Sequence, residues 1–262
     1  MNRTGLVIAL LTGACVGLVL GLFPQLDLAA SALFFDEPSR SFNIAHNVTA
    51  LRWRNAFVYL IAGLAAPAFI AVAVKFVLPR WRMIIPARAA LFLIATLALA
   101  PGLMANVILK DYWGRPRPYD VQRFNGPETF IPWWDPRGPC DKNCSFVAGE
   151  GAGAFWTLAP AALAPPPWNA LAYGAALAFG AMAGGLRMSF GAHFLSDVVF
   201  SGVFTFLIIW TIHGLIYRWR TRFTDAQVEQ AIERVALPPH EALQRLFARL
   251  GAMLGLGAGG RP

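Results

Sequence analysis

Six long apolar segments run through the chain, and they restrict it to folds that a lipid bilayer accepts. The segments cover residues 5–23, 56–78, 84–109, 146–163, 168–186 and 194–217. Each is close to the length of about 20 residues that an α-helix needs to cross the hydrocarbon core of a membrane. Because backbone polar groups inside a bilayer must bond to one another, such segments fold as helices. The sequence therefore predicts an all-α protein built as a bundle of six transmembrane helices.

The composition supports a membrane protein. Hydrophobic residues make up 57% of the 262 residues and charged residues only 14%, a balance that differs strongly from that of water-soluble domains. The formal net charge of +8 is on its own compatible with nucleic-acid binding. However, the sequence shows no basic stripe interleaved with aromatic residues on a soluble element. We therefore expect the positive charge to face an anionic lipid bilayer, with no nucleic acid as partner.

The loops between the segments predict the orientation of the bundle. Residues 75–88 carry Lys75, Arg80, Arg82 and Arg88 without an acidic residue, and more arginines follow the sixth segment. Basic loops of this kind stay on the cytoplasmic side of a membrane. Six spans then place both termini in the cytoplasm and put loop 110–145 on the outer side.

Two domains follow from this arrangement. We expect a six-span membrane domain over residues 1–222, and a cytoplasmic tail over residues 223–262 that is amphipathic at first and disordered at its end. Within the tail, Thr224 and Gln227 have the spacing of a capping box at the start of a helix. We expect a second amphipathic piece over residues 240–250.

Residues 187–197, with the sequence RMSFGAHFLSD, are the strongest candidates for chemistry. His193 and Asp197 are four residues apart, so in a helix both side chains lie on one face. A carboxylate beside an imidazole fixes its tautomer and favours the positive charge that develops on the ring. Arg187 precedes His193 by six residues, and its planar fork of donors suits a phosphate group. For this stretch alone, a membrane-surface histidine with an incidental aspartate is an equally simple interpretation.

A second stretch, KDYWGRPRP at residues 110–118, favours the chemical interpretation. It places Lys110, Arg115 and Arg117 within eight positions, among residues that interrupt a helix. Three cations so close repel one another unless an anion or the membrane surface compensates them. A positive anchor at a helix end needs neither fixed spacing nor prolines, so we interpret the stretch as a phosphate clamp.

A third stretch, CSFVAGEGAGAF at residues 144–155, opens the fourth segment with small residues. Ala148 and Gly149 leave backbone N–H groups free at an expected helix N-terminus, where phosphate binds readily. Cys140 and Cys144 flank the approach to it, and we favour a disulfide between them if the loop is periplasmic. A zinc site is less favoured because a second pair of ligands is missing. We expect no metal and no cofactor.

Taken together, these stretches resemble the type 2 phosphatidic acid phosphatase superfamily of membrane lipid phosphatases. That family shows K-x6-RP, then PSGH, then SR-x5-H-x3-D. Lys110 with Arg117-Pro118 matches the first motif, and Arg187, His193 and Asp197 match the third at the same spacing. The second motif is degenerate, because VAGE at residues 147–150 keeps only its glycine. Leu186 stands where the family usually has serine.

The resemblance implies metal-independent removal of a phosphate through a phosphohistidine. His193 is then the nucleophile and Asp197 orients it. Glu150 takes the place of the family's acid–base histidine and is expected to protonate the leaving oxygen. The groups expected to hold the phosphate oxygens are Lys110, Arg117, Arg187 and the backbone amides of Ala148 and Gly149.

The sequence NCSFVAGE with its cysteine pair is similar to bacterial enzymes that remove phosphate from lipid A. This similarity implies a multi-pass protein of the bacterial inner membrane, with its active site at the periplasmic surface and a membrane lipid phosphate as substrate. Undecaprenyl pyrophosphate and phosphatidylglycerol phosphate are alternative substrates, and a lipid phosphotransferase is an alternative activity. A non-catalytic lipid-binding or transport protein is the alternative from another class. The His193–Asp197 pair argues against it, because binding alone does not need such a pair.

Overall fold

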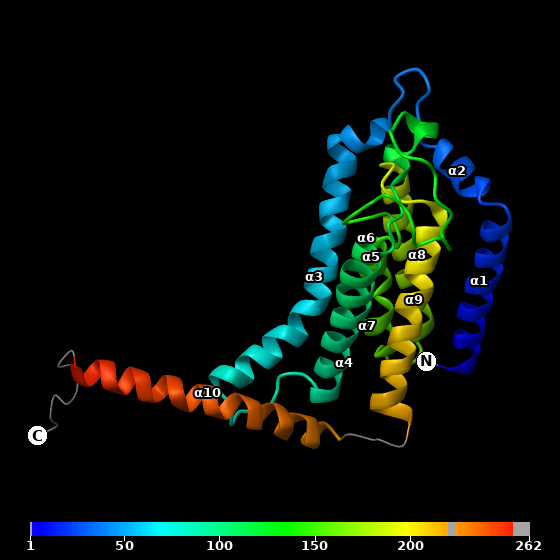
Figure 1. The fold of residues 1–262 in the computed structure, drawn as a ribbon. Coiled ribbons are helices and arrows are strands. Elements are labelled where there is room, and N and C mark those ends of the chain that lie inside the picture. The colour runs from blue at the N-terminus through cyan, green and yellow to red at the C-terminus, as the bar shows by residue number, and fades with distance from the viewer. Residues whose placement is uncertain (1, 220–223, 254–262) are drawn as a thin grey trace, which may run out of the picture.

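The computed structural model describes residues 2–219 and 224–253, and these residues form helices without a β-strand (Figure 1). The all-α class predicted from the sequence is confirmed. Within the described residues, five helical stretches are long and apolar enough to cross a membrane. They are α1 (Arg3–Leu22), α3 (Val48–Val77), the continuous α4, η2 and α5 (Ala87–Leu97, Ala98–Leu109 and Lys110–Tyr112), α8 (Asn169–Ser189), and α9 with η5 (Leu195–His213 and Gly214–Arg218).

The fourth apolar segment differs from its prediction, because it forms no long helix. It folds as α6 (Gly149–Phe155) and α7 (Leu158–Ala162), with a turn between them at Trp156 and Thr157. The part of the chain that the structure describes thus has five helices of spanning length, where the sequence predicts six. The break is tolerated because α6 lies inside the bundle, in contact with α3, η2, α8 and α9. Irregular backbone at membrane depth is stable only when protein covers it in this way.

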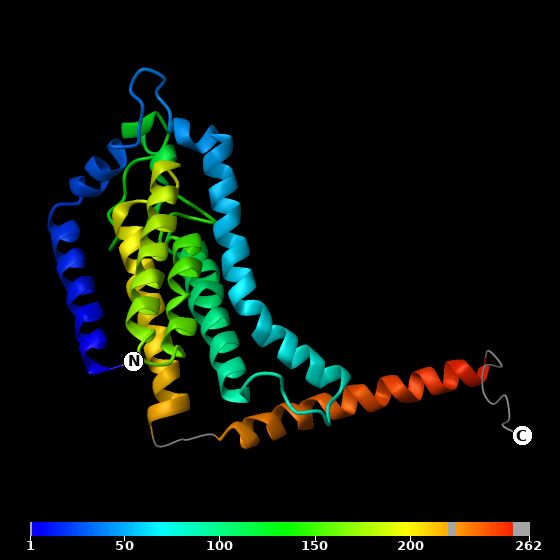
Figure 2. The same cartoon turned by 180° about the vertical axis from the view of Figure 1, so that it is seen from behind.

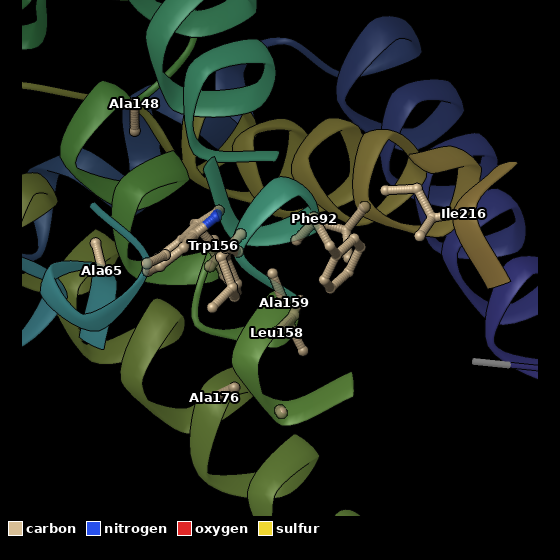
Figure 3. Packing of buried hydrophobic residues seen from close by; sticks show 14 of the residues in the cluster. Ala65, Phe92, Ala148, Trp156, Leu158, Ala159, Ala176 and Ile216 are labelled. Atoms are coloured by element: carbon tan, nitrogen blue, oxygen red, sulfur yellow. The ribbon is translucent and has the colours of Figure 1, made fainter. Parts of the chain in front are cut away.

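Trp156 anchors the broken segment in the main hydrophobic core. Its side chain is fully buried, and its indole Nε1 donates a hydrogen bond of 2.9 Å to Thr96 Oγ1 on α4. Figure 3 shows Trp156 between Ala148 of the α6 start and Phe92 of α4. A buried indole needs such a polar partner, so this bond fixes α6 and α7 against the third span.

The third span widens where it approaches the loop 110–145. Pro101 lies inside it, and the backbone from Ala98 to Leu109 follows a π-helical path. Proline removes a backbone donor and displaces the preceding carbonyl groups. Asn106 Nδ2 donates to the Pro101 carbonyl oxygen at 2.6 Å within this segment. π-Helical segments often mark functional sites, and this one leads directly into Lys110.

A cap of aromatic side chains covers the end of the bundle opposite to α10 (Asp225–Met253). α2 (Gln25–Ala32), η1 (Asn43–His46), η3 (Pro118–Asp120) and η4 (Gln122–Phe124) surround it. Phe42, Phe124 and Phe194 belong to its buried core. Gly191 has a φ of +65°, and a side chain there would collide with the Phe42 ring. The left-handed turn at this glycine brings the chain from α8 into α9 directly beside His193.

The C-terminal tail forms one helix, α10 (Asp225–Met253), instead of the two pieces predicted. The predicted capping box is present, since Gln227 N donates to Thr224 Oγ1 at 3.2 Å and Thr224 N donates to Gln227 Oε1 at 2.9 Å. Pro238 and Pro239 lie within α10 and remove two backbone donors without ending it. The stretch 255–262 (GLGAGGRP), predicted to be disordered, lies outside the described residues.

α10 is docked to the bundle through its first half. The buried Lys75 Nζ lies 3.0 Å from Glu229 and 3.5 Å from Glu233, and Arg88 pairs with Asp225 at 3.1 Å. Figures 1 and 2 show α10 crossing the ends of α3 and α4, at the end of the bundle opposite to α2. The basic loop 75–88 is therefore neutralised in part by this helix.

Candidate active site

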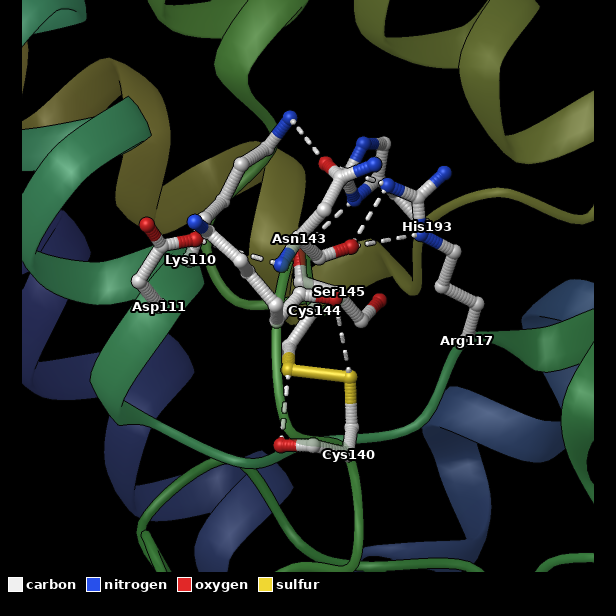
Figure 4. Close-up of a disulfide and its surroundings, with 9 residues drawn as sticks. Lys110, Asp111, Arg117, Cys140, Asn143, Cys144, Ser145 and His193 are labelled. Carbon is white, nitrogen blue, oxygen red and sulfur yellow. Dashed lines mark hydrogen bonds between the residues drawn. A yellow bond between two sulfur atoms is a disulfide. The ribbon is translucent and has the colours of Figure 1, made fainter.

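The charged residues predicted for the site come from separate elements. Lys110 lies in α5, Glu150 in the first turn of α6, and Arg187 in the last turn of α8. Arg117 precedes η3, and His193 lies in the short connection from α8 to α9. Figure 4 shows Lys110, Arg117 and His193 gathered around one loop.

His193 is buried and held by a backbone oxygen. Its Nδ1 lies 2.7 Å from the carbonyl oxygen of Ser145. A carbonyl oxygen only accepts hydrogen bonds, so this contact assigns the ring proton to Nδ1 and leaves the lone pair on Nε2. Burial lowers the pKa of His193 below its usual value of 6.5, against the opposing charge of Asp197. The ring is therefore neutral at pH 7, as a nucleophile must be.

Asp197 orients His193 mainly through Ser145. Its Oδ2 is 3.8 Å from His193 Nδ1, too far for a hydrogen bond. The same oxygen accepts from Ser145 Oγ at 2.5 Å and from the Phe194 amide at 2.7 Å. Ser145 thus joins the two predicted residues, with its hydroxyl on Asp197 and its carbonyl on His193. Ser145 was not predicted from the sequence, because no motif position marks it.

Arg115 does not belong to the phosphate clamp, in contrast to the prediction for stretch 110–118. It is fully buried and lies 2.5 Å from Asp197 Oδ1 and 2.8 Å from Asp27 Oδ2 on α2. Its Nε donates to the Ile131 carbonyl oxygen at 2.9 Å. Two buried carboxylates attract this guanidinium away from the surface, where only Lys110 and Arg117 of the stretch remain.

The clamp residues Lys110 and Arg117 converge on Asn143. Arg117 Nη2 donates to the Asn143 carbonyl oxygen at 2.7 Å and to its Oδ1 at 2.8 Å, and Lys110 Nζ approaches Oδ1 at 3.4 Å (Figure 4). Oxygen atoms of the protein thus lie between the two cations. Phosphate oxygens have the same hydrogen-bonding character, so this geometry suits an anionic tetrahedral group.

Cys140 and Cys144 form a disulfide in the loop that carries Asn143, with their Cα atoms 5.8 Å apart. The Cys144 amide donates to the Lys110 carbonyl oxygen at 2.8 Å, and the Cys140 amide donates to Gly114 at 3.1 Å. The two bridged residues therefore bond the loop to Lys110 and Gly114 of the stretch that bears the clamp.

Gly149 and Ala148 have different surroundings. A Cβ at Gly149 would collide with Asn106 and lie 3.0 Å from Lys110 Nζ, so only glycine leaves room for the lysine head. The Ala148 amide donates to the Asp197 carbonyl oxygen at 3.2 Å. It is thus already bonded, and of the two amides predicted to bind phosphate we retain Gly149.

Glu150 forms an ion pair that the sequence analysis missed. Arg54 on α3 contacts both of its carboxylate oxygens, at 2.6 Å through Nη2 and at 3.0 Å through Nε. Burial by itself raises the pKa of Glu150, but the hydrogen bonds from Arg54 and the charge of Arg187 outweigh it and hold the pKa below its usual value. Glu150 is therefore ionised at neutral pH.

A small cavity of about 180 Å³ opens beside this pair. Polar groups of Arg54, Asn106, Glu150 and Arg187 line one part of it, and apolar side chains of α3 and the third span line the rest. A larger groove of about 650 Å³ lies between α3 and α8, with Trp53, Phe57 and Leu186 in its wall. Phe57 and Leu186 line both hollows, so charged and apolar surfaces adjoin at the site.

The fold and the site define a helical membrane protein in which a neutral histidine lies beside a cluster of cations. The profile of the PAP2 superfamily matches residues 89–224. These residues cover every predicted site residue. The chain belongs to the PAP2 superfamily, and it is a membrane phosphatase.

The similar proteins share one name. Lipid A 4'-phosphatase of Francisella tularensis subsp. novicida (strain U112) is 35% identical over 201 residues, which are 75% of this chain and 89% of that protein. The Rhizobium leguminosarum protein of the same name is 40% identical over 106 residues, 40% of this chain and 46% of that protein. The Rhizobium etli protein is 39% identical over 105 residues, 40% of this chain and 41% of that protein. No solved structure gives a significant match.

The buried Arg115 network predicts a large loss of stability when the guanidinium is removed. Arg115→Met leaves the Asp27 and Asp197 carboxylates buried without a counter-charge, which costs about 3–5 kcal/mol. Thermal unfolding in detergent, followed by circular dichroism, measures the loss. Arg123→Met is the matched control, since its partner Glu37 is exposed and exposed ion pairs contribute at most about 1 kcal/mol. Equal unfolding temperatures for the two variants would show that the network does not stabilise the fold.

The covalent state of the cysteines gives a second prediction. We expect a peptide pair joined through Cys140 and Cys144 in non-reducing mass spectrometry of the purified protein. Cys15 is free, so it should be alkylated in the same sample once the protein is unfolded in denaturant, and it serves as the internal control. Alkylation of all three cysteines without prior reduction would contradict the bridge.

Proposed function

We propose that the chain removes a phosphate group from lipid A, by hydrolysis through a phosphohistidine, at the periplasmic surface of a bacterial inner membrane. The observation that carries the proposal is the neutral His193, held by Ser145 with Nε2 free, beside the cations Lys110, Arg117 and Arg187. The name shared by the three relatives favours lipid A over other lipid phosphates.

The first chemical step forms a bond from His193 Nε2 to phosphorus and breaks the bond from phosphorus to the leaving oxygen. Lys110, Arg117, Arg187 and the Gly149 amide hold the equatorial oxygens and compensate their charge. Phosphoryl transfer depends chiefly on such positioning and electrostatic stabilisation. Glu150 donates the proton that the leaving oxygen needs. Asp197 stabilises the positive imidazole ring across the Ser145 bridge.

The second step returns the protein to its starting state. A water molecule attacks phosphorus and the P–N bond breaks, so that inorganic phosphate forms. Glu150, now a carboxylate, accepts a proton from this water. For Glu150 to act first as an acid it must gain a proton after the substrate binds. The incoming phosphate dianion favours this, because a nearby like charge raises the pKa of a carboxyl group.

The arrangement of charge supports the proposed orientation. Loop 75–88 and α10 lie at one end of the bundle, and the loop that carries Asn143 lies toward the other (Figure 1). Cytoplasmic loops are the more basic ones, so we place loop 75–88, α10 and both termini in the cytoplasm. The groove between α3 and α8 supports a lipid substrate, since its apolar wall suits acyl chains.

The test is an assay of purified protein against a panel of lipids, with a chelator present. We expect release of phosphate from lipid A to exceed release from undecaprenyl pyrophosphate and phosphatidylglycerol phosphate, and mass spectrometry of the lipid identifies the phosphate lost. Equal or faster release from another lipid would overturn the substrate assignment. Phosphate appearing on a second lipid instead of in solution would identify a phosphotransferase.

His193→Ala should abolish turnover, because no other group replaces the attacking Nε2. The variant should keep the unfolding temperature of the wild type within a few degrees, which shows that the loss is chemical. The acid limb of wild-type kcat/KM should lie at lower pH than the titration of a free histidine, because burial lowers the pKa of His193. Near wild-type phosphate release by the variant would end the phosphohistidine mechanism.

Glu150→Gln should lower kcat on substrates with an alcohol leaving group by roughly 10²–10⁴-fold, the usual contribution of general acid–base catalysis. The amide keeps the shape of the side chain but cannot transfer the proton. The loss should be smaller for a pyrophosphate substrate, whose leaving phosphate needs less protonation. An unchanged kcat on lipid A would remove Glu150 from the proton transfer.

A further inference from the structure

Arg54 is the charged residue of this site that no sequence motif contains. It lies on α3, 96 positions before Glu150, and forms a two-point contact with the Glu150 carboxylate across the cavity. Its side chain is 39% exposed and that of Glu150 29%. A fork-to-carboxylate contact fixes the direction of both groups, as well as their distance.

Arg187 competes for the same carboxylate. Its Nε lies 3.7 Å from Glu150 Oε2 and is buried without a hydrogen-bond partner among the described residues. A buried N–H without a partner carries a free-energy penalty. This donor can therefore bind either the Glu150 carboxylate or an oxygen of the substrate. The two-point contact with Arg54 holds Glu150 at the distance observed, and thereby leaves Arg187 available.

We propose that Arg54 is a further positioning residue of the active site, which holds Glu150 away from Arg187 so that a phosphate oxygen can bind there. The inference rests on the proposed function, since it assigns Arg187 to the phosphate and Glu150 to the proton transfer. Arg54 acts through Glu150 and does not need to touch the reacting atoms.

A variant without Arg54 should therefore bind phosphate poorly for a specific reason. In Arg54→Gln, the Glu150 carboxylate moves to the free Nε of Arg187 and competes with the phosphate for it. Removing the competitor as well, in Arg54→Gln/Glu150→Gln, restores the site for the anion. The two substitutions are thus expected to be strongly non-additive, as for groups that act as one unit.

Loss of Arg54 should also change the pKa of Glu150. The charged and titratable groups that face Glu150 are Arg54 from α3, Arg187 from α8, Lys110 from α5, and His193 from the connection between α8 and α9. In the substrate complex a phosphate oxygen takes up the Arg187 Nε, so loss of the Arg54 charge leaves the carboxylate less stabilised and the pKa of Glu150 rises. The acid form then persists to higher pH, and the alkaline limb of kcat moves to higher pH.

The first experiment measures binding of inorganic phosphate to the purified full-length protein by calorimetry, which does not depend on turnover. We expect Arg54→Gln to weaken binding roughly tenfold, in keeping with the loss of a charged hydrogen bond, and the double variant to return to the affinity of Glu150→Gln. Arg54→Lys keeps the positive charge but cannot make the two-point contact, so its phosphate affinity should lie between those of the wild type and Arg54→Gln. Arg52→Gln, an exposed arginine on the same helix, is the matched control and should bind as the wild type does.

The second experiment records kcat against pH for the wild type, Arg54→Gln and Arg52→Gln. Unchanged phosphate affinity together with an unmoved alkaline limb in Arg54→Gln would overturn the inference. Additive effects in the double variant would overturn it too, because they would mean that Arg54 contacts the anion directly. Another outcome is that the phosphate affinities of the single and double variants follow the expected pattern in a protein whose turnover does not depend on His193. That result would refute the proposed function and would still support the positioning role of Arg54.

Discussion

The Arg115 guanidinium is sealed from solvent between two carboxylates, and the geometry of the active site depends on it. A charge buried in this way is stable only when its partners and remaining donors are all bonded, and here Asp27, Asp197 and the Ile131 carbonyl provide this. The two carboxylates come from α2 and α9, so the ion network ties a helix at the end of the bundle opposite to α10 to the last span. Since Asp197 also receives the Ser145 hydroxyl, the position of His193 follows from the same network.

The bilayer requirement made most of the fold predictable, whereas the broken fourth segment was beyond prediction from the sequence. Long apolar runs have one stable solution in lipid, so α1, α3, α8 and α9 lie close to their predicted segments. Gly- and Ala-rich runs are ambiguous, because the same residues suit a tightly packed long helix and a buried break. Whether stretch 146–163 continues as a helix depends on partners such as Thr96 for Trp156, which lies 60 positions away.

Local spacing made part of the site predictable, since the clamp and the His193–Asp197 pair each lie within one short stretch. The residues that were missed are those brought in by tertiary contacts. Asp27 is separated from Ser196, to which it also bonds, by 169 positions. One signal for Asp27 is present in the sequence, namely an acidic residue inside the apolar run 26–35, which must find a cation if it is buried. Arg54 gives no such signal, because an arginine at the edge of a span is ordinary.

The net charge of the site explains how glutamate can replace the family's histidine in the second motif. A neutral imidazole adds no charge to a site whose clamp must attract a phosphate dianion. A lone carboxylate would cancel one of the three clamp cations, since Coulomb interactions at these distances amount to several kcal/mol away from bulk water. Glu150 paired with Arg54 again adds no net charge, so the field of Lys110, Arg117 and Arg187 is preserved. The pair also contains a group that can gain and lose a proton. A histidine alone, or a glutamate paired with an arginine from α3, therefore adds no net charge and still provides a group that can gain and lose a proton. The glutamate meets both requirements only together with Arg54, which the fold brings to it from a distant part of the chain.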